Sequence, residues 1–359
     1  ISPLTTDEIA MRRKTFSRFW TEPELPTFSF RSGPACTALE VAASVGNIPL
    51  FDQVRAANQD ESWWTTREIP PQPADVLTHS ALSVSSPMHE AIVSGQHEML
   101  QHLLSIGYSP NILPFAAPTC CIPPHMTAIA FCDPPDLVAH DLLALDPRTD
   151  TTIRTPVFSI HVLHFATAHL DIPLMQYICK APTTPLSAAG TTSLGHTLLH
   201  ITSLPLTDAH INLFSHKIFK SIHDVRTLET RTWYPINLRR RNPANRGILH
   251  SRADTAPLPH EFKREDEADQ KKQEAMVLWL LESGTQDLAA KDVYGNTPLH
   301  YLMSVVRVNE ELIGKLRAKE GGERVWKESK NEMGYSPEDL LEDGREAQVD
   351  QWKDFWMED

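Results

Sequence analysis

A short phrase recurs along this chain of 359 residues and limits what the chain can fold into. It reads GNTPLHYLM at 295–303, and variants read SPMHEAIVS at 86–94, GHTLLHITS at 195–203 and RGILHSRAD at 246–254. A Leu-His or Met-His pair occurs five times, with the histidines at His89, His164, His200, His250 and His300. This self-similarity indicates an array of small units, because one such unit cannot bury its own apolar face and must stack on a neighbour.

The phrase has the chemistry of a turn followed by a helix. Gly295 suits a tight turn, Thr297 can cap a helix, and Pro298 suits the first helical position, where no amide donor is needed. Leu299 is expected to point inward. The ring of His300 can form hydrogen bonds with nearby backbone groups. We therefore predict that these histidines fasten one unit to the next, and that they neither bind a metal nor catalyse a reaction.

Eight positions align on the Thr of this phrase, at intervals of 34 to 50 residues: Thr37, Ser86, Thr127, His161, Thr197, Gly247, Thr297 and Ser336. A second apolar helix is predicted after each first one. The clearest is HEMLQHLLSIG at 97–107, whose apolar stripe comprises Met99, Leu100, Leu103 and Leu104. In the third copy Ala130 stands at the histidine position, and a double proline separates the two predicted helices.

These segments resemble the ankyrin repeat family over about residues 36–345. SPMHEAIVSGQHEMLQHLLSIGYSPN and DVYGNTPLHYLM come close to the family pattern, whereas TALEVAASVGNIPLFDQV has Glu40 in place of the histidine. The resemblance implies an all-α solenoid of about eight stacked helix-turn-helix units, with β-hairpin-like or long loop connections. The last copy has Glu338 in place of a leucine, which suits a polar-faced capping repeat.

In proteins of this family, the hairpin tips and the inner face of the first helices bind the partner. Carried over to matching positions of this chain, that surface includes Glu90, Val93, Phe165, His169, Tyr294, Asn296 and Tyr301. The aromatic residues Phe165, Tyr294 and Tyr301 are expected to contribute most, because interface energy concentrates in a few large side chains.

Stretches that exceed the repeat period are predicted as insertions, near 59–85, 108–125, 223–246 and 254–272. The first carries Trp63 and Trp64, which either dock a partner or fold back on neighbouring helices. The second has the spacing CCxxxH from Cys120 to His125, which is not a familiar zinc pattern and is interpreted as thiols in a proline-rich hairpin. The fourth has mixed charge and is predicted as either a mobile loop or the start of an extended helix.

The third insertion belongs to the most basic part of the chain. From Lys217 to Arg264 there are 11 Lys and Arg against 4 Asp and Glu, a balance of +7 in a chain whose net charge is −13. The run Arg239, Arg240 and Arg241 is interpreted as a site for an acidic segment of another protein, as a nuclear-import signal, or as a solvated loop that pairs with the chain's own acidic surface. Contact with RNA or DNA is a more distant alternative, given the negative net charge.

Composition and motifs narrow the function class. Five cysteines are too few, and odd in number, for a disulfide framework, so free thiols in the cytoplasm or nucleus are expected. The sequence has no apolar run long enough for a membrane span, no phosphate-binding glycine loop and no nucleophile elbow. A non-catalytic scaffold or adaptor that binds another protein and needs no cofactor is the leading interpretation. Because the chain begins at Ile1, the alternative is a regulatory or targeting segment of a larger enzyme or transcription regulator.

The ends of the chain are predicted to cover the ends of the array. Residues 1–35 contain a capping box, Thr5 with Glu8, and are expected to form a helical cap. Residues 346–359 place two tryptophans at helical spacing and are expected to form a helical tail that either packs on the array or binds a partner.

Overall fold

A computed structural model gives the structure of the chain, and it describes residues 38–57, 86–112, 123–130, 132, 134–155, 159–180, 184–192, 195–203, 259–303, 308–332 and 334–342. Regular secondary structure in these ranges is helical, which confirms the all-α prediction. The chain divides into two compact units. Among the described residues, the N-terminal unit holds those up to Ala166 and within Ile178–Ala188, and the C-terminal unit holds Thr167–Tyr177 and those from Ala189 onward.

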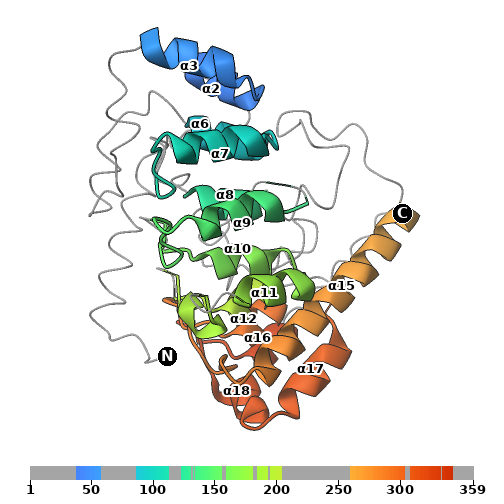
Figure 1. Cartoon of the computed structure of the whole chain (residues 1–359). Helices are drawn as coiled ribbons and strands as arrows, with labels where there is room; N and C mark the ends of the chain where they lie inside the picture. The colour runs from blue at the N-terminus through green and yellow to red at the C-terminus, as the bar shows by residue number, and fades with distance from the viewer. Residues whose placement is uncertain are drawn as a thin grey trace, which may run out of the picture. The chain divides into compact units, whose positions relative to one another are not determined.

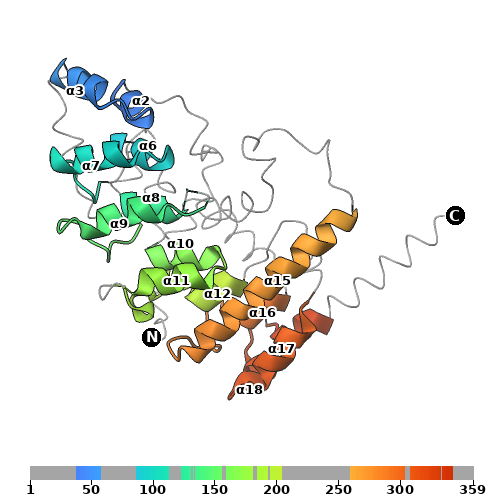
Figure 2. The same cartoon turned by 45° about the vertical axis from the view of Figure 1, so that its right-hand side comes forward.

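Helix pairs form successive layers of the N-terminal unit (Figures 1 and 2). The pairs are α2 (Ala38–Ser44) with α3 (Ile48–Ala57), α6 (Pro87–Val93) with α7 (His97–Ser105), and α8 (Pro124–Ala130) with α9 (Leu137–Leu145). Helix α6 packs against α2 and α8, and α7 packs against α9, so each layer covers the apolar face of the next. The largest core side chains of these layers include Phe51, Met88, Leu100 and Tyr108.

Local signals set the start of α6. The Ser86 hydroxyl accepts a hydrogen bond from the His89 backbone N–H at 3.3 Å, and Pro87 occupies the first turn. The next helix, α7, buries most of its predicted apolar stripe, namely Met99, Leu100 and Leu103. The turn and helix chemistry predicted from the recurrent phrase is therefore confirmed in this repeat.

The third repeat begins one turn earlier than the alignment on Thr127 predicts. Helix α8 starts at Pro124, which holds the place of the proline in the other units, so Met126 and not Ala130 stands at the histidine position. The alignment was wrong because Pro124 can start a helix without losing an amide donor, and the same apolar pattern continues one turn later. The Thr127 hydroxyl donates to the Pro123 carbonyl at 3.1 Å inside this first turn. The double proline does separate α8 from α9, as predicted.

The C-terminal unit is built around short first helices. It contains α12 (Leu198–Ser203), α15 (Pro259–Glu282), α16 (Pro298–Met303), α17 (Glu310–Arg317) and α18 (Gly322–Glu328). Helix α12 packs against α15 and α16, and α17 packs against α18. Every residue of α12 and α16 is buried. The boundary between the two units falls within α10 (Val162–Ala168) and α11 (Ile172–Cys179), and a 3₁₀ turn, η2 (Leu186–Ala189), follows them.

Helix α15 contains most of the fourth predicted insertion. It begins at Pro259, so the second alternative, an extended helix, is correct. Gln273 Nε2 donates to the Thr202 carbonyl at 2.7 Å, and Glu274 Oε1 pairs with Lys315 Nζ at 2.6 Å. These contacts tie α15 to α12 and α17. The apolar residues that α15 buries include Met276, Val277 and Leu280.

Parts of the predicted organisation lie outside the described residues. These are the flank 1–35, the tail 346–359, the insertions 59–85 and 223–246, and the copy of the phrase at Gly247. The limits 36–345 for a repeat domain therefore stay a prediction. Of the second insertion, 108–112 and 123–125 are described, and Tyr108 and Ile112 are buried in the N-terminal core.

Candidate interaction surface

Three hairpin turns of the C-terminal unit share one geometry. In each, the backbone N–H of the first residue donates to the carbonyl of the fifth at 2.9 Å, in the pairs Thr192–His196, Asp292–Asn296 and Asn331–Tyr335. The fourth residue is a glycine with positive φ: Gly195 (83°), Gly295 (77°) and Gly334 (86°). Other residues are strained in this conformation, so the turn explains the glycine of the recurrent phrase.

Successive hairpins lie in close contact. A Cβ placed on Gly295 would lie 3.2 Å from the Cα of Asn331, and a Cβ on Gly195 would lie 3.0 Å from the Cα of Asp292. Asn331 Nδ2 also donates to Asn296 Oδ1 at 3.0 Å. The hairpins therefore stack directly, and the glycines are needed for space as well as for conformation.

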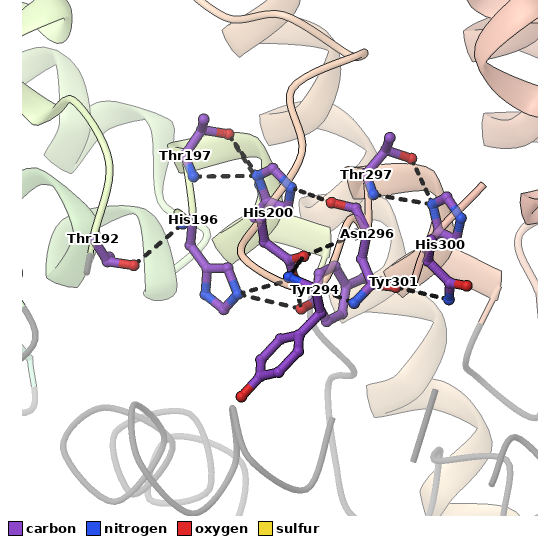
Figure 3. Close-up of polar contacts among 11 residues, drawn as sticks. Thr192, His196, Thr197, His200, Tyr294, Asn296, Thr297, His300 and Tyr301 are labelled. Carbon is purple, nitrogen blue, oxygen red and sulfur yellow. Dashed lines mark hydrogen bonds and ion pairs between the residues drawn. The ribbon is translucent and has the colours of Figure 1, made fainter. Parts of the chain in front are cut away.

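Two histidines join the start of a helix to the following hairpin (Figure 3). His200 Nδ1 accepts from the Thr197 backbone N–H at 3.2 Å, and His200 Nε2 donates to the Asn296 carbonyl at 3.1 Å. His300 repeats this arrangement with the N–H of its own threonine at 3.0 Å and with the Tyr335 carbonyl at 3.0 Å. The predicted fastening role is confirmed for both.

This geometry requires neutral rings. An Nδ1 atom that accepts a hydrogen bond leaves the single ring proton on Nε2, which faces a carbonyl. Burial lowers the pKa of His200 and of His300 to about 4, so both rings are neutral at pH 7. In the N-terminal unit, His89 Nδ1 lies 2.6 Å from the Ser86 hydroxyl oxygen, which repeats the first half of the arrangement.

Asp292 lies at the centre of the buried network. Its Oδ1 accepts from the backbone N–H groups of Tyr294 and Asn296 at 2.8 Å each, and its Oδ2 accepts from the Tyr301 hydroxyl. The same Oδ2 lies 3.6 Å from His196 Nε2. Burial acts to raise the pKa of Asp292, but hydrogen bonding and electrostatic attraction, led by His196, outweigh burial and lower that pKa below its usual value.

His196 and Tyr301 complete the network. His196 Nε2 lies 3.2 Å from the Tyr301 hydroxyl, and the ring of His196 stacks on that of His200 with 5.6 Å between centroids. All three side chains are fully buried. Asp, Tyr and His groups in contact are also the groups of acid–base catalysis, but here their polar atoms face one another in the core. The arrangement therefore stabilises the contact between adjoining repeats.

Four residues predicted for a partner-binding surface are buried. Phe165, Asn296 and Tyr301 have no exposed surface, and His169 is 3% exposed. The prediction that they are accessible is wrong. Helix α16 is buried along its whole length, so helical spacing gives it no exposed inner face, and the Tyr301 hydroxyl binds Asp292.

Other predicted residues keep some accessible surface. Glu90 and Val93 on α6 are half-buried, and so is Tyr294, whose ring is directed away from the buried network in Figure 3. The remaining predicted contacts lie outside the described residues: Trp63, Trp64, Arg239, Arg240 and Arg241.

Several exposed apolar side chains were missed by the sequence interpretation. On α9, Val138 is 53% exposed and Leu145 is 81% exposed, and directly after α2, Val45 is 60% exposed. Val41 on α2, which the family resemblance also assigns to the partner-binding surface, is 44% exposed. A signal was present for α9, because its sequence LVAHDLLAL is apolar on nearly every face and one helix face must lie outward.

The sulfur and metal chemistry of the described part is limited. Cys132 and Cys179 are free thiols, as predicted, and burial raises the pKa of Cys179 to about 11, so this thiol stays protonated and unreactive. Within the described ranges, no three His, Cys, Asp or Glu side chains are grouped as metal ligands would be. None of the helices in these ranges combines the length and apolarity needed to cross a bilayer.

The stacked hairpins, the histidine fasteners and the paired helices define an array of stacked helical repeats, the all-α solenoid that the resemblance to the ankyrin repeat family predicts. Among solved structures, the chain is similar to the ankyrin repeat domain of Bcl-3, described as a unique member of the IkappaB protein family. The TM-score is 0.44 at 15% sequence identity, and the match covers 86% of this chain and 98% of that one. No protein-family model and no curated protein matches the sequence. The fold assignment therefore rests on the hairpins and fasteners of the chain itself.

Proposed function

We propose that this chain is a non-catalytic scaffold or adaptor that binds another protein. The observation that carries the proposal is the use of its polar groups: the His, Tyr and Asp side chains of the recurrent phrase bind one another and the backbone inside the stack. These groups hold repeats together. Recognition is then left to the hairpin tips, the loops and the exposed helix positions, which are the variable parts of such arrays.

Each unit offers a surface of its own. On α6, Glu90 and Val93 occupy positions equivalent to Val41 and Ser44 on the adjacent α2, where Val41 is exposed and Ser44 is half-buried. In the C-terminal unit, the Tyr294 ring extends from a hairpin (Figure 3). A partner that covers these positions gains from the burial of apolar and aromatic side chains.

Three further features belong to the proposal. The run from Arg239 to Arg241 binds an acidic segment of the partner, and Trp63 and Trp64 add a second contact. The sparse cysteines favour the cytoplasm or nucleus as the compartment of the protein. As an alternative, the chain is the regulatory or targeting segment of a larger enzyme or transcription regulator.

The proposal is tested by using the intact chain as bait in native cell extract and quantifying recovered proteins by mass spectrometry. We expect at least one protein whose recovery falls tenfold or more with Glu90→Arg plus Val93→Asp, with Tyr294→Ala, or with a chain that lacks 223–246. The matched control is Glu98→Arg, which makes the same charge change on the exposed face of α7 and is expected to leave recovery unchanged.

Each result has a definite meaning. Partners that survive all three changes would show that the assigned surfaces are wrong. If no protein is enriched over the extract by the intact chain, the scaffold proposal itself fails. Loss with the deletion alone would place recognition in the basic segment.

A further inference from the structure

Three histidines of the N-terminal unit are buried with at least one ring nitrogen that has no hydrogen-bond partner. His125 lies on α8, His140 on α9 and His161 directly before α10, and their exposed fractions are 1%, 8% and 1%. Neither ring nitrogen of His125 has a hydrogen-bond partner, and the same is true of His140 Nδ1 and His161 Nε2. Unsatisfied polar atoms at such depth are uncommon and call for an explanation.

The three rings lie near enough to one another to interact electrostatically. A charge on His140 or on His161 opposes a charge on His125. This mutual repulsion adds to the larger cost of burial, and together they lower the pKa of His125 to about 3. Burial, followed by the charge of Arg154, lowers the pKa of His161 to about 4, and burial lowers that of His140.

Few opposing charges face the cluster. Asp150 attracts a charge on His125 and Asp141 attracts one on His140, but each effect is smaller than that of burial. The adjacent α6 carries His89 and Glu90, and the His89 ring contacts the Ser86 hydroxyl. Helix α7, which packs against α9, carries His97, and its Nε2 already pairs with Asp136 Oδ2 at the start of α9 at 2.8 Å. A protonated ring inside this layer therefore has no carboxylate strong enough to offset its desolvation.

We propose that His125, His140 and His161 make the α8–α9 layer an acid-sensitive element, which is closed while the three rings are neutral and opens when they take up protons. The layer lies against α6 inside the stack, so its opening exposes the apolar core on which the neighbouring repeat packs. This inference does not depend on the proposed scaffold function.

Proton linkage gives the expected change of the opening equilibrium with pH. An opened ring titrates at its ordinary value of 6.5, whereas the buried ring does not accept a proton until far lower pH. Between pH 7.5 and 5.5 the equilibrium constant for opening is expected to rise about tenfold for each ring, hence about a hundredfold for His125 and His161 together.

The test is amide hydrogen exchange of the full chain at pH 7.5 and 5.5, followed by mass spectrometry of peptides within 123–145. After correction for the intrinsic exchange rate, we expect the opening constant of these peptides to rise by the amount above. His125→Phe keeps the volume apolar and removes one titrating ring, so the rise is expected to shrink about tenfold. His102→Gln, a change at the surface of α7 beside Asp52, is the matched control and is expected to leave the rise unchanged.

Two results would overturn the inference. The first is an equal opening constant at both pH values, or a rise that His125→Phe leaves intact. The second serves where that variant does not fold: in the wild-type chain, nitrogen NMR of the imidazoles is expected to show three rings that stay neutral until the layer opens. Rings that titrate near pH 6.5 while α8 and α9 amides remain protected would contradict the proposal.

Discussion

At the scale of single residues, the Tyr301 hydroxyl decides how well the carboxylate of Asp292 is accommodated in the core. Tyr301→Phe removes this donor and leaves a buried carboxylate oxygen without its closest partner, so we expect a loss of about 1 to 3 kcal/mol in the free energy of unfolding. Urea denaturation measures this. Tyr294→Phe, at the half-buried hairpin position, is the control and is expected to change stability by less than about 0.5 kcal/mol. Equal losses in the two variants would show that the hydrogen bond from Tyr301 to Asp292 does not add to the free energy of unfolding.

The two histidine fasteners predict how stability depends on pH. Their folded pKa of about 4 lies below the ordinary 6.5, so the folded state binds fewer protons, and their stabilisation is complete above pH 6.5 and is lost as pH falls toward 4. Each ring should cost about 1.4 kcal/mol by pH 5.5 relative to pH 7.5. Asp292 does not offset this loss. Its pKa is lowered from 3.8, so its own contribution to stability changes only at pH values below those compared here.

His300→Gln isolates one fastener. We expect the variant to be less stable at pH 7.5 but to lose about 1.4 kcal/mol less than the wild type when the pH is lowered to 5.5. Urea titrations of both proteins at the two pH values supply the comparison. A loss of the same size in both proteins would mean that folding does not lower the pKa of His300.

The residue roles were only partly predictable from sequence. The function of His300 could be predicted, because its partners are the threonine three residues earlier and the backbone of the next repeat. Tyr301 could not, because helical spacing placed it on an inner face, while its hydroxyl binds an acid nine residues earlier through the fold of the hairpin. The spacing reports which face a residue occupies and not what covers that face.

At the scale of elements, the glycine of each hairpin serves two purposes that can be separated. Gly295→Ala strains a positive φ, which is expected to destabilise the fold by about 1 to 2 kcal/mol. The added Cβ also presses on the Asn331 backbone, which is expected to cost about 1 to 3 kcal/mol more. Gly334 has a similar φ but no atom within 4 Å of its Cβ direction, so Gly334→Ala should cost only the first part. The difference between the two variants in thermal or urea unfolding measures the stacking of hairpins. Equal losses would contradict close stacking as the reason for the glycine.

Element existence was easier to predict than element position. The pairing of a short first helix with an apolar second helix was correct for α6 with α7 and for α16 with α17. The start of α8 was misplaced by one turn, because two prolines and a continuous apolar run offered two equivalent starts. The long α15 was left open between loop and helix, since its charged first half has no apolar pattern and its buried face is supplied only by packing on α12.

At the scale of the whole molecule, the contrast between a net charge of −13 and a basic segment predicts salt-sensitive binding. If Arg239, Arg240 and Arg241 hold an acidic partner, affinity should fall as salt is raised from about 50 to 300 mM, because screening shortens the reach of these charges. Changing the three arginines to glutamate should abolish most of that salt dependence. Trp63→Ala with Trp64→Ala should weaken binding at every salt concentration by a similar factor. Isothermal titration with a recovered partner decides, and an unaltered salt slope in the glutamate variant would exclude the arginines.

The packing of α12 against α15 has a consequence for how the chain reaches its native state. Residues 204–258 separate these two helices in sequence, whereas α6 and α7 are joined by a tight turn. Closing the longer connection costs roughly 2 kcal/mol more chain entropy before any contact is gained. The α6–α7 repeat can therefore form as a local, fast event, while the α12–α15 pair has to wait for a slow encounter between distant segments. During synthesis, α12 leaves the ribosome well before its packing partner, and its apolar side chains Leu198, Leu199 and Ile201 must be shielded in the interval.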